Sequence, residues 1–421
     1  MTNSAPRVLF IYSPSRIHYW SSLATNHSPL ATFFAGCRMK LNLAEIREIR
    51  LPLVHFFETS FGRTTERRIA LVRAEADGLT GWGEVTCGEQ PFYSHETPET
   101  AWHILRDFLI PWTLGREFKA AADVAPLFQR IRGHNMAKAA LENALWAIEA
   151  RQKGLPLAKC IGGTLDEIPC GVSIGIQNTI EELLEKIEGE VAAGYQRIKV
   201  KVKPGWDVNV LERIRGRFPG IVLSVDANCA YTLADLAHLK QFDRFNLLMI
   251  EQPLHWEDLV DHAKLQRELT TALCLDESIH SADDARKAIE IGACRIINVK
   301  LGRVGGFTSA RQIHDVCRAS EVPVWCGGML ESGIGRAHNI AMSSLPGFTL
   351  PGDVSASRRY WAQDIIDPEV VVSPRGTIRI PQALGLGFAP NLDRIERITT
   401  KKECFEASTV FSQLSKSGSR E

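Results

Sequence analysis

From about residue 168 onward, the chain alternates short apolar segments with longer amphipathic ones. The amphipathic segments, such as "TIEELLEKIEGEVAAG", carry apolar residues at helical spacing, and Gly194 is the expected C-terminal stop of this helix. Strands that alternate with helices pair in parallel through right-handed crossovers, and eight of them predict a closed barrel with its helices outside. The eight apolar segments read "IPCGVSIGI", "RIKVKV", "IVLSVDAN", "LLMIEQP", "LCLDES", "RIINVKL", "VPVWCGGML" and "FTLPGDVS".

The chain ahead of these segments follows a different pattern. "LNLAEIREIRL" and "RRIALVRAEADGLTGWGEV" alternate as antiparallel strands do, and Asp77-Gly78 predicts a tight hairpin between two of them. Helical periodicity follows in "ETAWHILRDFLIPW" and "MAKAALENALWAIEARQKG". We therefore predict an α+β unit over residues 39–165 and the barrel over residues 166–356. "VVVSPRGTIRIPQ" again resembles a strand, which predicts that residues 357–398 complete the first unit.

The two ends of the chain do not continue these patterns. "SPLATFFAGC", which ends at Cys37, has the small-residue ending of a lipoprotein export signal. A disordered extension over residues 1–38, or an over-long start with Met39 as the natural beginning, is the interpretation we favour. "SQLSKSGSRE" predicts a frayed tail, which we place at residues 399–421.

Composition excludes several classes of partner. Lys plus Arg and Asp plus Glu are balanced at 49 each in the 421 residues, without a basic block, so we expect no nucleic acid partner. No apolar run approaches the ~18 residues of a membrane span, so we expect no membrane partner. The ten cysteines are scattered singly without a C-x-x-C pair, which suits a protein of the reducing cytoplasm.

Charged residues stand at or near the ends of five consecutive predicted strands. The C-terminal ends of parallel barrel strands form one rim, where the active sites of barrels are built. The sequence therefore predicts that five charged groups meet at one mouth of the barrel. They recur at intervals of 24 or 25 residues and are Lys201, Asp226, Glu251, Asp276 and Lys300.

The three acidic residues of this set, Asp226, Glu251 and Asp276, suggest a metal site. Taken alone, each carboxylate is typical of a helix N-cap or a first-turn charge. Their equal spacing favours a shared site, because hard oxygen ligands on three adjacent strands suit Mg²⁺, with Mn²⁺ as a substitute. Zinc would favour His or Cys ligands instead.

The stretch "RIKVKVKPGWD" places Lys199, Lys201 and Lys203 on one face of a strand, because strand side chains alternate between two faces. Charge can protect an exposed edge strand, but this strand lies among parallel strands that are covered on both faces. The lysines therefore point to a chemical site. Lys199 is expected to lower the pKa of Lys201 and make it a usable base.

Lys300 ends the sixth strand, on the far side of the three carboxylates from Lys201. A small carboxylate substrate held at the cation would then have one amine on each side of its α-carbon. This arrangement predicts removal of a proton α to a carboxylate, with the cation stabilising the enediolate that forms. The alternative to an enzyme is a binding protein, in which the barrel binds a carboxylate or a metal without catalysing a reaction.

Six motifs carry a resemblance to a known family: "RIKVKVKPGWD", "SVDAN", "LLMIEQPL", "CLDESI", "INVKLGRVGG" and "PVWCGGMLESGIGRAHN". They resemble the enolase superfamily, muconate-lactonizing subgroup, and most closely the o-succinylbenzoate synthase / N-succinylamino acid racemase family. The similarity runs from about residue 39 to about residue 398 and includes "PFYS" and "GHNMAKAALENALWAIEA". It implies an α/β fold, a modified (β/α)7β TIM-like barrel with an α+β capping domain, and a homo-oligomer.

The resemblance also implies roles for individual residues. It makes Lys201 the general base and acid, Lys199 its partner and Lys300 the opposite lysine, with the three carboxylates as Mg²⁺ ligands. Asn228 and Glu277 neighbour these ligands, although each is also a plausible helix cap. Arg303 stands where racemase-competent members carry arginine. The positions that match the substrate pocket of the family are Ser173, Tyr93, Gly328 and Met329.

Two enzymatic hypotheses follow from the resemblance. The first is a Mg²⁺-dependent o-succinylbenzoate synthase of menaquinone biosynthesis, which removes water from 2-succinyl-6-hydroxy-2,4-cyclohexadiene-1-carboxylate. The second is an N-succinylamino acid racemase, in which both lysines act as alternating bases. Departures from the family pattern are small, namely Leu301 where many members have proline and Lys203 where an acidic residue is usual.

Overall fold

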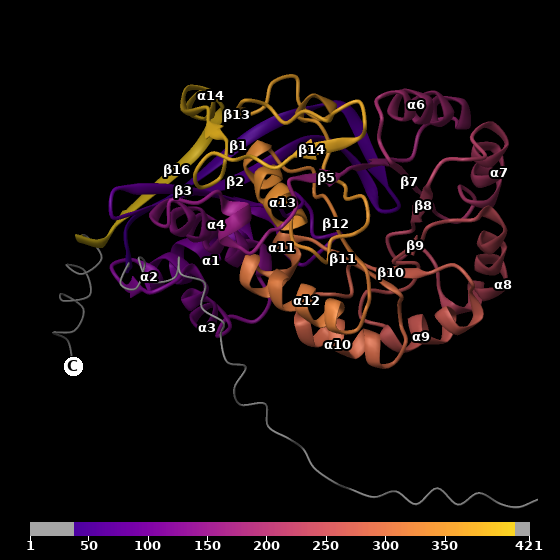
Figure 1. The fold of residues 1–421 in the computed structure, drawn as a ribbon, viewed down its shortest axis with the longest axis horizontal. Helices are drawn as coiled ribbons and strands as arrows, with labels where there is room; N and C mark the ends of the chain where they lie inside the picture. The colour runs from indigo at the N-terminus through magenta and orange to yellow at the C-terminus, as the bar shows by residue number, and fades with distance from the viewer. Residues whose placement is uncertain (1–37, 409–421) are drawn as a thin grey trace, which may run out of the picture. The chain divides into compact units, whose positions relative to one another are not determined.

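Seven parallel strands, surrounded by helices, form the larger part of the fold (Figure 1). The structure is a computed structural model that describes residues 38–408. They pair in the order β12-β11-β10-β9-β8-β7-β6, so each strand lies beside its neighbour in sequence, as right-handed crossovers predict. The strands are β6 (Gly171–Ile174), β7 (Arg197–Lys201), β8 (Leu223–Asp226), β9 (Ile250–Glu251), β10 (Leu273–Leu275), β11 (Ile296–Val299) and β12 (Val324–Cys326).

The helices between these strands follow the predicted alternation. Thr179 caps the first of them and accepts a hydrogen bond from the Glu182 backbone N–H, while Gly194 adopts a φ of 92° just past its end. The barrel helices are α6 (Ile180–Ala192), α7 (Val208–Arg217), α8 (Leu236–Leu239), α9 (Leu259–Glu268), α10 (Ala282–Glu290), α11 (Leu301–Val304), α12 (Phe307–Ala319) and α13 (Gly333–Ser343). Two short helical turns, η4 (Leu233–Asp235) and η5 (Lys240–Phe245), flank α8.

The eighth predicted strand, "FTLPGDVS", is not a regular strand in the structure. Its residues form single parallel bridges instead, from Phe348 to Val324 of β12 and from Gly352 to Cys170 beside β6. Pro351 has no backbone N–H to donate, which prevents a continuous ladder. The segment still lies between the first and last strands, and the modified (β/α)7β barrel is confirmed.

An antiparallel sheet forms the predicted α+β unit. Its order is β16-β1-β2-β3, with β4 paired to β1. Asp77 and Gly78 have φ angles of 51° and 76° and join β2 to β3, so the predicted hairpin is confirmed. The strands are β1 (Met39–Thr59), β2 (Gly62–Ala76), β3 (Leu79–Val85), β4 (Glu117–Phe118) and β16 (Thr399–Glu406).

Helix α4 (Asn135–Gln152) packs closely against β3 of this sheet. A Cβ atom on Gly83 would lie 1.8 Å from the backbone oxygen of Ala140, so the close approach requires glycine at this position. The remaining helices of the unit are short: α1 (Pro98–Ile104), η2 (Leu105–Leu109), α2 (Ile110–Thr113), η3 (Ala121–Val124), α3 (Ala125–Phe128) and α5 (Leu157–Cys160).

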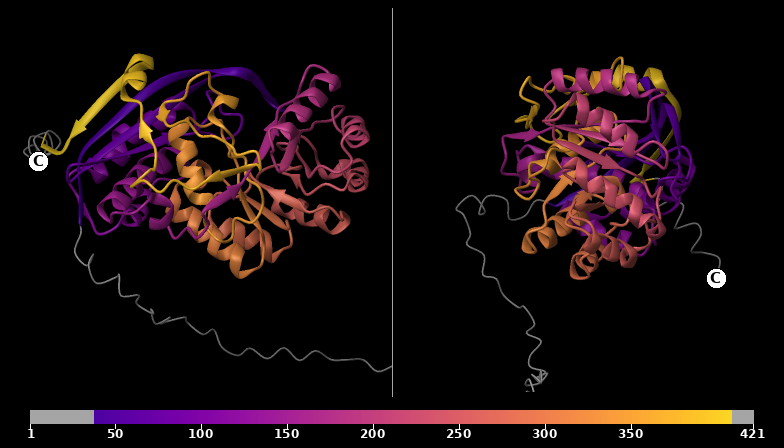
Figure 2. Two further views of the ribbon diagram at one scale, coloured as in Figure 1. Left: turned by 45° about the horizontal axis from the view of Figure 1, so that its top comes forward. Right: turned by 90° about the vertical axis from the view of Figure 1, so that its right-hand side faces the viewer.

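The C-terminal part of the chain differs from the prediction at residue 399. The sequence predicts a tail from this position, whereas β16 pairs with β1 at the edge of the antiparallel sheet. Figure 2 shows the two strands side by side. Its sequence "TTKKECFE" lacks a buried apolar face, so periodicity alone does not reveal it. Residues 1–37 and 409–421, on which the predicted extension and the end of the predicted tail fall, lie outside the described residues.

The segment that links the barrel to β16 runs back along both parts of the fold. Strand β14 (Thr377–Arg379) pairs with β5 (Glu167–Pro169), and β13 (Ile366–Asp367) pairs with β15 (Ala389–Pro390). Turn η6 (Ser357–Arg359) and helix α14 (Leu392–Ile398) complete the segment. Among the described residues, no helix is both long enough and apolar enough to span a bilayer.

Candidate active site

The three predicted metal-binding carboxylates lie together at one rim of the barrel. Asp226 and Glu251 are register partners at the ends of β8 and β9, and Asp276 follows the end of β10. All three are buried, and one oxygen from each lies within 4.8 Å of the others. Three hard oxygen donors at this spacing can hold a divalent cation and leave open positions for a ligand.

Charges inside this triad also favour a cation. Burial and the neighbouring carboxylates of Asp226 and Asp276 raise the pKa of Glu251 to about 7, although Lys199 opposes the shift. Burial also raises the pKa of Asp226, but the ammonium groups of Lys201 and Lys199 outweigh it and hold this pKa below its usual range. A divalent cation would relieve the repulsion between the carboxylates, so the donor set fits a metal such as Mg²⁺.

The two outer lysines bracket the triad. Lys201 Nζ donates to Asp226 Oδ2 at 2.6 Å and to Asn228 Oδ1 at 2.7 Å, at one side of the carboxylates. Lys300 Nζ donates to Asp276 Oδ2 at 2.7 Å and to the Tyr93 hydroxyl at 3.1 Å, at the other side. The order of strands in the sheet therefore separates the two amines, as the sequence predicts.

Lys199 lies deeper in the barrel than Lys201 on the same face of β7. Its Nζ is 2.7 Å from Glu251 Oε2, 3.4 Å from Asp226 Oδ2 and 2.8 Å from Asp353 Oδ2. Burial lowers the pKa of Lys199, but these three carboxylates outweigh burial and raise it above its usual range. Lys199 thus remains a cation that holds Glu251, and its predicted effect on the pKa of Lys201 stays a prediction.

Asp353 is a buried residue of the site that the sequence analysis missed. Its Oδ1 accepts from Arg197 Nη2 at 2.8 Å, and its Oδ2 accepts from Ser173 Oγ at 3.1 Å in addition to Lys199. Burial raises its pKa, but Arg197 and Lys199 outweigh burial and hold the pKa well below its usual range. Asp353 stands near the end of the eighth apolar segment, "FTLPGDVS", so the rule that identified the other strand-end charges could have found it.

Asn298 on β11 is a second missed residue. Its Nδ2 donates to Glu251 Oε1 at 2.7 Å, while Lys199 Nζ donates to Glu251 Oε2. Both oxygens of the central carboxylate are therefore oriented by protein groups. Asn298 lies two residues before Lys300 and therefore on the same face of the chain, which is the signal that could have identified it.

Asn228 and Glu277 link the ends of the triad, as neighbours of the metal ligands would. Asn228 accepts from Lys201 and donates through Nδ2 to Glu277 Oε1 at 2.9 Å. Its φ of 44° lies in the left-handed region that asparagine tolerates. Burial, followed by Asp276 and Asp226, raises the pKa of Glu277 to about 8.

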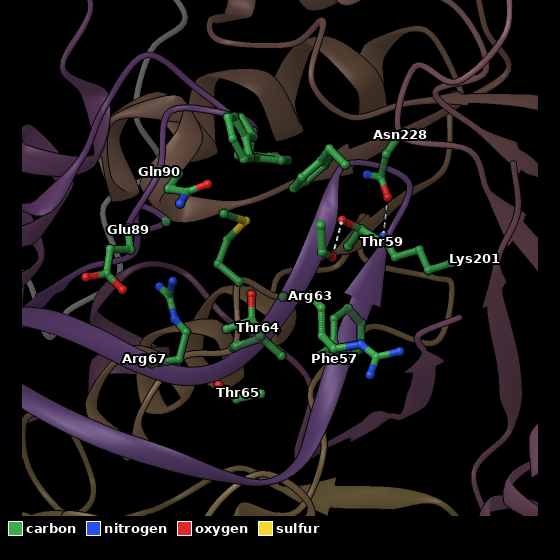
Figure 3. Close-up of a pocket in the computed structure, with 18 of the residues that line it drawn as sticks. Phe57, Thr59, Arg63, Thr64, Thr65, Arg67, Glu89, Gln90, Lys201 and Asn228 are labelled. Atoms are coloured by element: carbon green, nitrogen blue, oxygen red, sulfur yellow. Dashed lines mark hydrogen bonds between the residues drawn. The ribbon is translucent and has the colours of Figure 1, made fainter. Parts of the chain in front are cut away.

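A cavity of about 440 Å³ opens above these groups and is lined by both outer lysines. Figure 3 shows Lys201 and Asn228 at this cavity. Tyr93, Asn228, Gly328 and Met329 from the sequence analysis also line it. The tip of the β1–β2 hairpin supplies much of the opposite wall, which the sequence analysis missed although "FFETSFGRT" joins aromatic residues to a turn glycine. The hairpin residues on this wall include Phe57, Thr59, Phe61, Arg63 and Arg67.

Neither Ser173, which the resemblance places in the substrate pocket, nor Arg303 is among the residues that line this cavity. Ser173 instead donates to Asp353. Arg303 is bonded to Asp276, to the carbonyl oxygen of Ile279 at 2.7 Å and to the Tyr93 hydroxyl at 3.3 Å. The charge of Arg303 is thus taken up by Asp276, whose pKa is held low by Lys300 and Arg303 although burial raises it.

Comparison with known proteins gives the class to which this architecture belongs. Residues 44–162 match the family model described as "Mandelate racemase / muconate lactonizing enzyme, N-terminal domain". Residues 182–394 match the model described as "Enolase C-terminal domain-like". The two matches cover the antiparallel unit and most of the barrel, so the fold and the carboxylate triad define a member of the enolase superfamily.

Individual relatives narrow this class. An o-succinylbenzoate synthase from Geobacillus kaustophilus is 52% identical over 366 residues, which cover 87% of this chain and 97% of that protein. An N-succinylamino acid racemase from Amycolatopsis sp is 48% identical over 365 residues, which cover 86% and 99%. The crystal structure of an enolase superfamily member from Listeria innocua matches with a TM-score of 0.85 at 40% identity, covering 88% of this chain and 100% of that one. The chain belongs to the o-succinylbenzoate synthase / N-succinylamino acid racemase family of enzymes.

Proposed function

We propose that the chain is a Mg²⁺-dependent o-succinylbenzoate synthase that dehydrates 2-succinyl-6-hydroxy-2,4-cyclohexadiene-1-carboxylate. The observation that carries the proposal is the placement of Lys201 and Lys300 at opposite sides of one buried carboxylate triad, within one cavity. The high identity to relatives named o-succinylbenzoate synthase supports it.

Lys201 is the proposed base and acid of this reaction. As the neutral amine, its Nζ takes the proton from C1 of the substrate ring and then returns it to the departing C6 hydroxyl. One water leaves, the ring becomes aromatic, and Lys201 ends in the state in which it began. Asn228 holds the amine toward the cavity, because its Oδ1 accepts from Lys201 Nζ at 2.7 Å.

Lys300 is the proposed electrostatic partner. Burial lowers its pKa, but Asp276, Tyr93 and Glu251 outweigh burial and raise it well above the usual range, so Lys300 stays an ammonium ion. From the side opposite Lys201 it stabilises negative charge on the substrate carbanion. Mg²⁺ would be held by Asp226, Glu251 and Asp276. Its positive charge would stabilise the second negative charge that develops on the substrate carboxylate.

Two lysines two residues apart in the sequence provide a matched test. Lys201→Ala should reduce synthase turnover by more than about 10³-fold, because it removes the only proposed proton carrier. Lys203→Ala removes a lysine two residues past the end of β7, with a side-chain exposure of 39% and a 3.8 Å ion pair with Glu58. This variant should change turnover less than threefold, about 0.6 kcal/mol. Equal losses in both variants, or no o-succinylbenzoate from the parent protein with Mg²⁺, would refute the synthase.

A second activity, N-succinylamino acid racemase, is favoured by the same pair of amines. Two bases on opposite sides of a carbon can remove and return its proton on opposite faces. The racemase relative at 48% identity supports this alternative. Lys300 would then have to act as a base in one direction.

Proton exchange in D₂O tests the second activity. Each enantiomer of an N-succinylamino acid should exchange its α-hydrogen with solvent in the parent protein. Lys201→Ala should remove exchange for one enantiomer and Lys300→Ala for the other. If the parent protein exchanges the α-hydrogen of neither enantiomer, racemisation is excluded. If it binds Mg²⁺ but shows neither synthase nor racemase turnover, it is a binding protein.

A further inference from the structure

Arg67 on β2 is a buried cation that the proposed chemistry does not use. Its relative exposure is 5%, and its Nη2 donates to the backbone oxygens of Thr86 at 3.0 Å and Cys87 at 2.8 Å. Its Nε is buried without a hydrogen-bond partner. A guanidinium group carries five N–H donors and stays charged, so these two bonds leave much of its capacity unused.

The other buried cations of the site are neutralised by carboxylates. Three buried lysines and arginines within residues 38–408 form no ion pair: Arg67, Lys138 and Arg336. Of these three, Arg67 is the one that lines the cavity above the triad. The buried cations that are paired are Arg197, Lys199, Lys201, Lys300 and Arg303.

A buried charge without a counterion is costly, and the cost is offset when an anion binds to it. Figure 3 shows Arg67 and Lys201 entering the cavity from opposite sides. An anion bound to Arg67 would therefore be separated from the substrate carboxylate whose α-carbon reacts beside Lys201. A ligand with two separated carboxylates would satisfy both positions.

We propose that Arg67 binds the distal carboxylate of the substrate, the one at the end of its succinyl chain. This inference rests on the proposed function, because both candidate substrates carry one carboxylate at the reacting carbon and a second at the end of a succinyl group. The guanidinium group matches a carboxylate in planar geometry, Arg67 lines the cavity, and its known bonds use only Nη2. Arg67 thereby selects dicarboxylates over ligands with a neutral tail.

Arg63 offers a matched control on the same wall. It also lines the cavity, but its Nε pairs with Glu58 Oε2 at 2.7 Å and its Nη2 donates to Asn178 Oδ1 at 3.0 Å. Its charge is therefore already balanced within the protein. Loss of the Arg63 charge tests whether any nearby cation suffices.

Calorimetric titration with two ligands tests the proposal in the presence of Mg²⁺. The ligands are o-succinylbenzoate and 2-butyrylbenzoate, in which a methyl group replaces the distal carboxylate. The parent protein should bind o-succinylbenzoate about 10- to 100-fold more tightly, the range of a charge-assisted hydrogen bond. Arg67→Gln should abolish this preference while 2-butyrylbenzoate binds within threefold of the parent, about 0.6 kcal/mol. Arg67→Lys should retain part of the preference, and Arg63→Gln should retain it in full.

The outcomes separate the two proposals. If the parent turns over substrate but Arg67→Gln keeps the full preference for o-succinylbenzoate, the assignment of Arg67 is wrong and the proposed function stands. If the parent shows neither synthase nor racemase turnover and binds neither ligand, both proposals fail. If Arg67→Gln weakens both ligands equally, Arg67 is structural, because its bonds to Thr86 and Cys87 hold the loop, and the proposal is overturned.

Discussion

Replacement of Asp353 by asparagine should remove a large share of the stability of the barrel. The carboxylate is buried and pairs with Arg197 and Lys199 at 2.8 Å each. Asparagine keeps the shape of the side chain but leaves two buried cations short of one negative charge. Removal of one partner from a buried ion pair costs about 3–5 kcal/mol, because the remaining charge stays buried.

A surface pair provides the comparison for this variant. Glu188 and Arg217 are 2.8 Å apart, but their side chains are 58% and 54% exposed. Exposed pairs contribute about 0–1 kcal/mol, so Glu188→Gln should have little effect. Urea denaturation followed by circular dichroism measures both variants against the parent.

The pH dependence of the Asp353 effect has a defined sign. Because the folded-state pKa of Asp353 is lowered, its contribution to stability is present above the unfolded-state pKa of about 3.9 and is lost as the pH falls below it. The difference between parent and Asp353→Asn should therefore be constant near neutral pH. A loss of less than about 1 kcal/mol at neutral pH, equal to that of the surface variant, would show that Asp353 does not stabilise the barrel through its buried ion pairs.

Three further predictions concern the packing, the buried carboxylates and the metal. Gly83→Ala should destabilise by about 3 kcal/mol or more in urea denaturation, because its Cβ would lie 1.8 Å from backbone, whereas Gly189→Ala, with nothing within 4 Å, should not. Burial raises the pKa of Glu142 to about 7. Between about pH 4.5 and pH 7 the folded state therefore keeps a proton that the unfolded state has lost, and the free energy of unfolding falls as the pH rises through this range. Glu142→Gln should accordingly lose less thermal stability than the parent between about pH 5 and pH 8. Saturating Mg²⁺ should raise the Tm of the parent in a thermal scan, and Asp276→Asn should abolish this shift; an equal shift in the variant would argue against the triad as the site.

The rim of the barrel could be predicted from sequence because its determinants are local. Each strand-end charge lies a few residues from the start of the next helix, and parallel pairing brings equivalent positions to one rim. Asp226 and Glu251 are register partners for this reason. The hairpin at Asp77-Gly78 could likewise be predicted, since both positive φ angles belong to the turn itself.

Other features depend on contacts between distant parts of the chain. β16 is an edge strand with a mostly exposed surface, so its pairing with β1 leaves no apolar alternation to detect. The hairpin tip reaches the cavity only after the antiparallel unit and the barrel have come together. The sequence places Arg303 near the site, but it does not reveal that Arg303 pairs with Asp276. This pairing depends on how Asp276 shares its two oxygens between Arg303 and Lys300, which only the folded structure determines.

A crystal structure with Mn²⁺ and o-succinylbenzoate would show whether Lys201 and Lys300 face each other across a bound ligand. We expect anomalous density from Mn²⁺ between Asp226, Glu251 and Asp276, with the aryl carboxylate beside it. Lys201 Nζ and Lys300 Nζ should lie on opposite faces of the ring carbon that bears this carboxylate. Mn²⁺ bound elsewhere, or both amines on one face of the ring, would show that this site does not hold the metal and the lysines in the proposed roles.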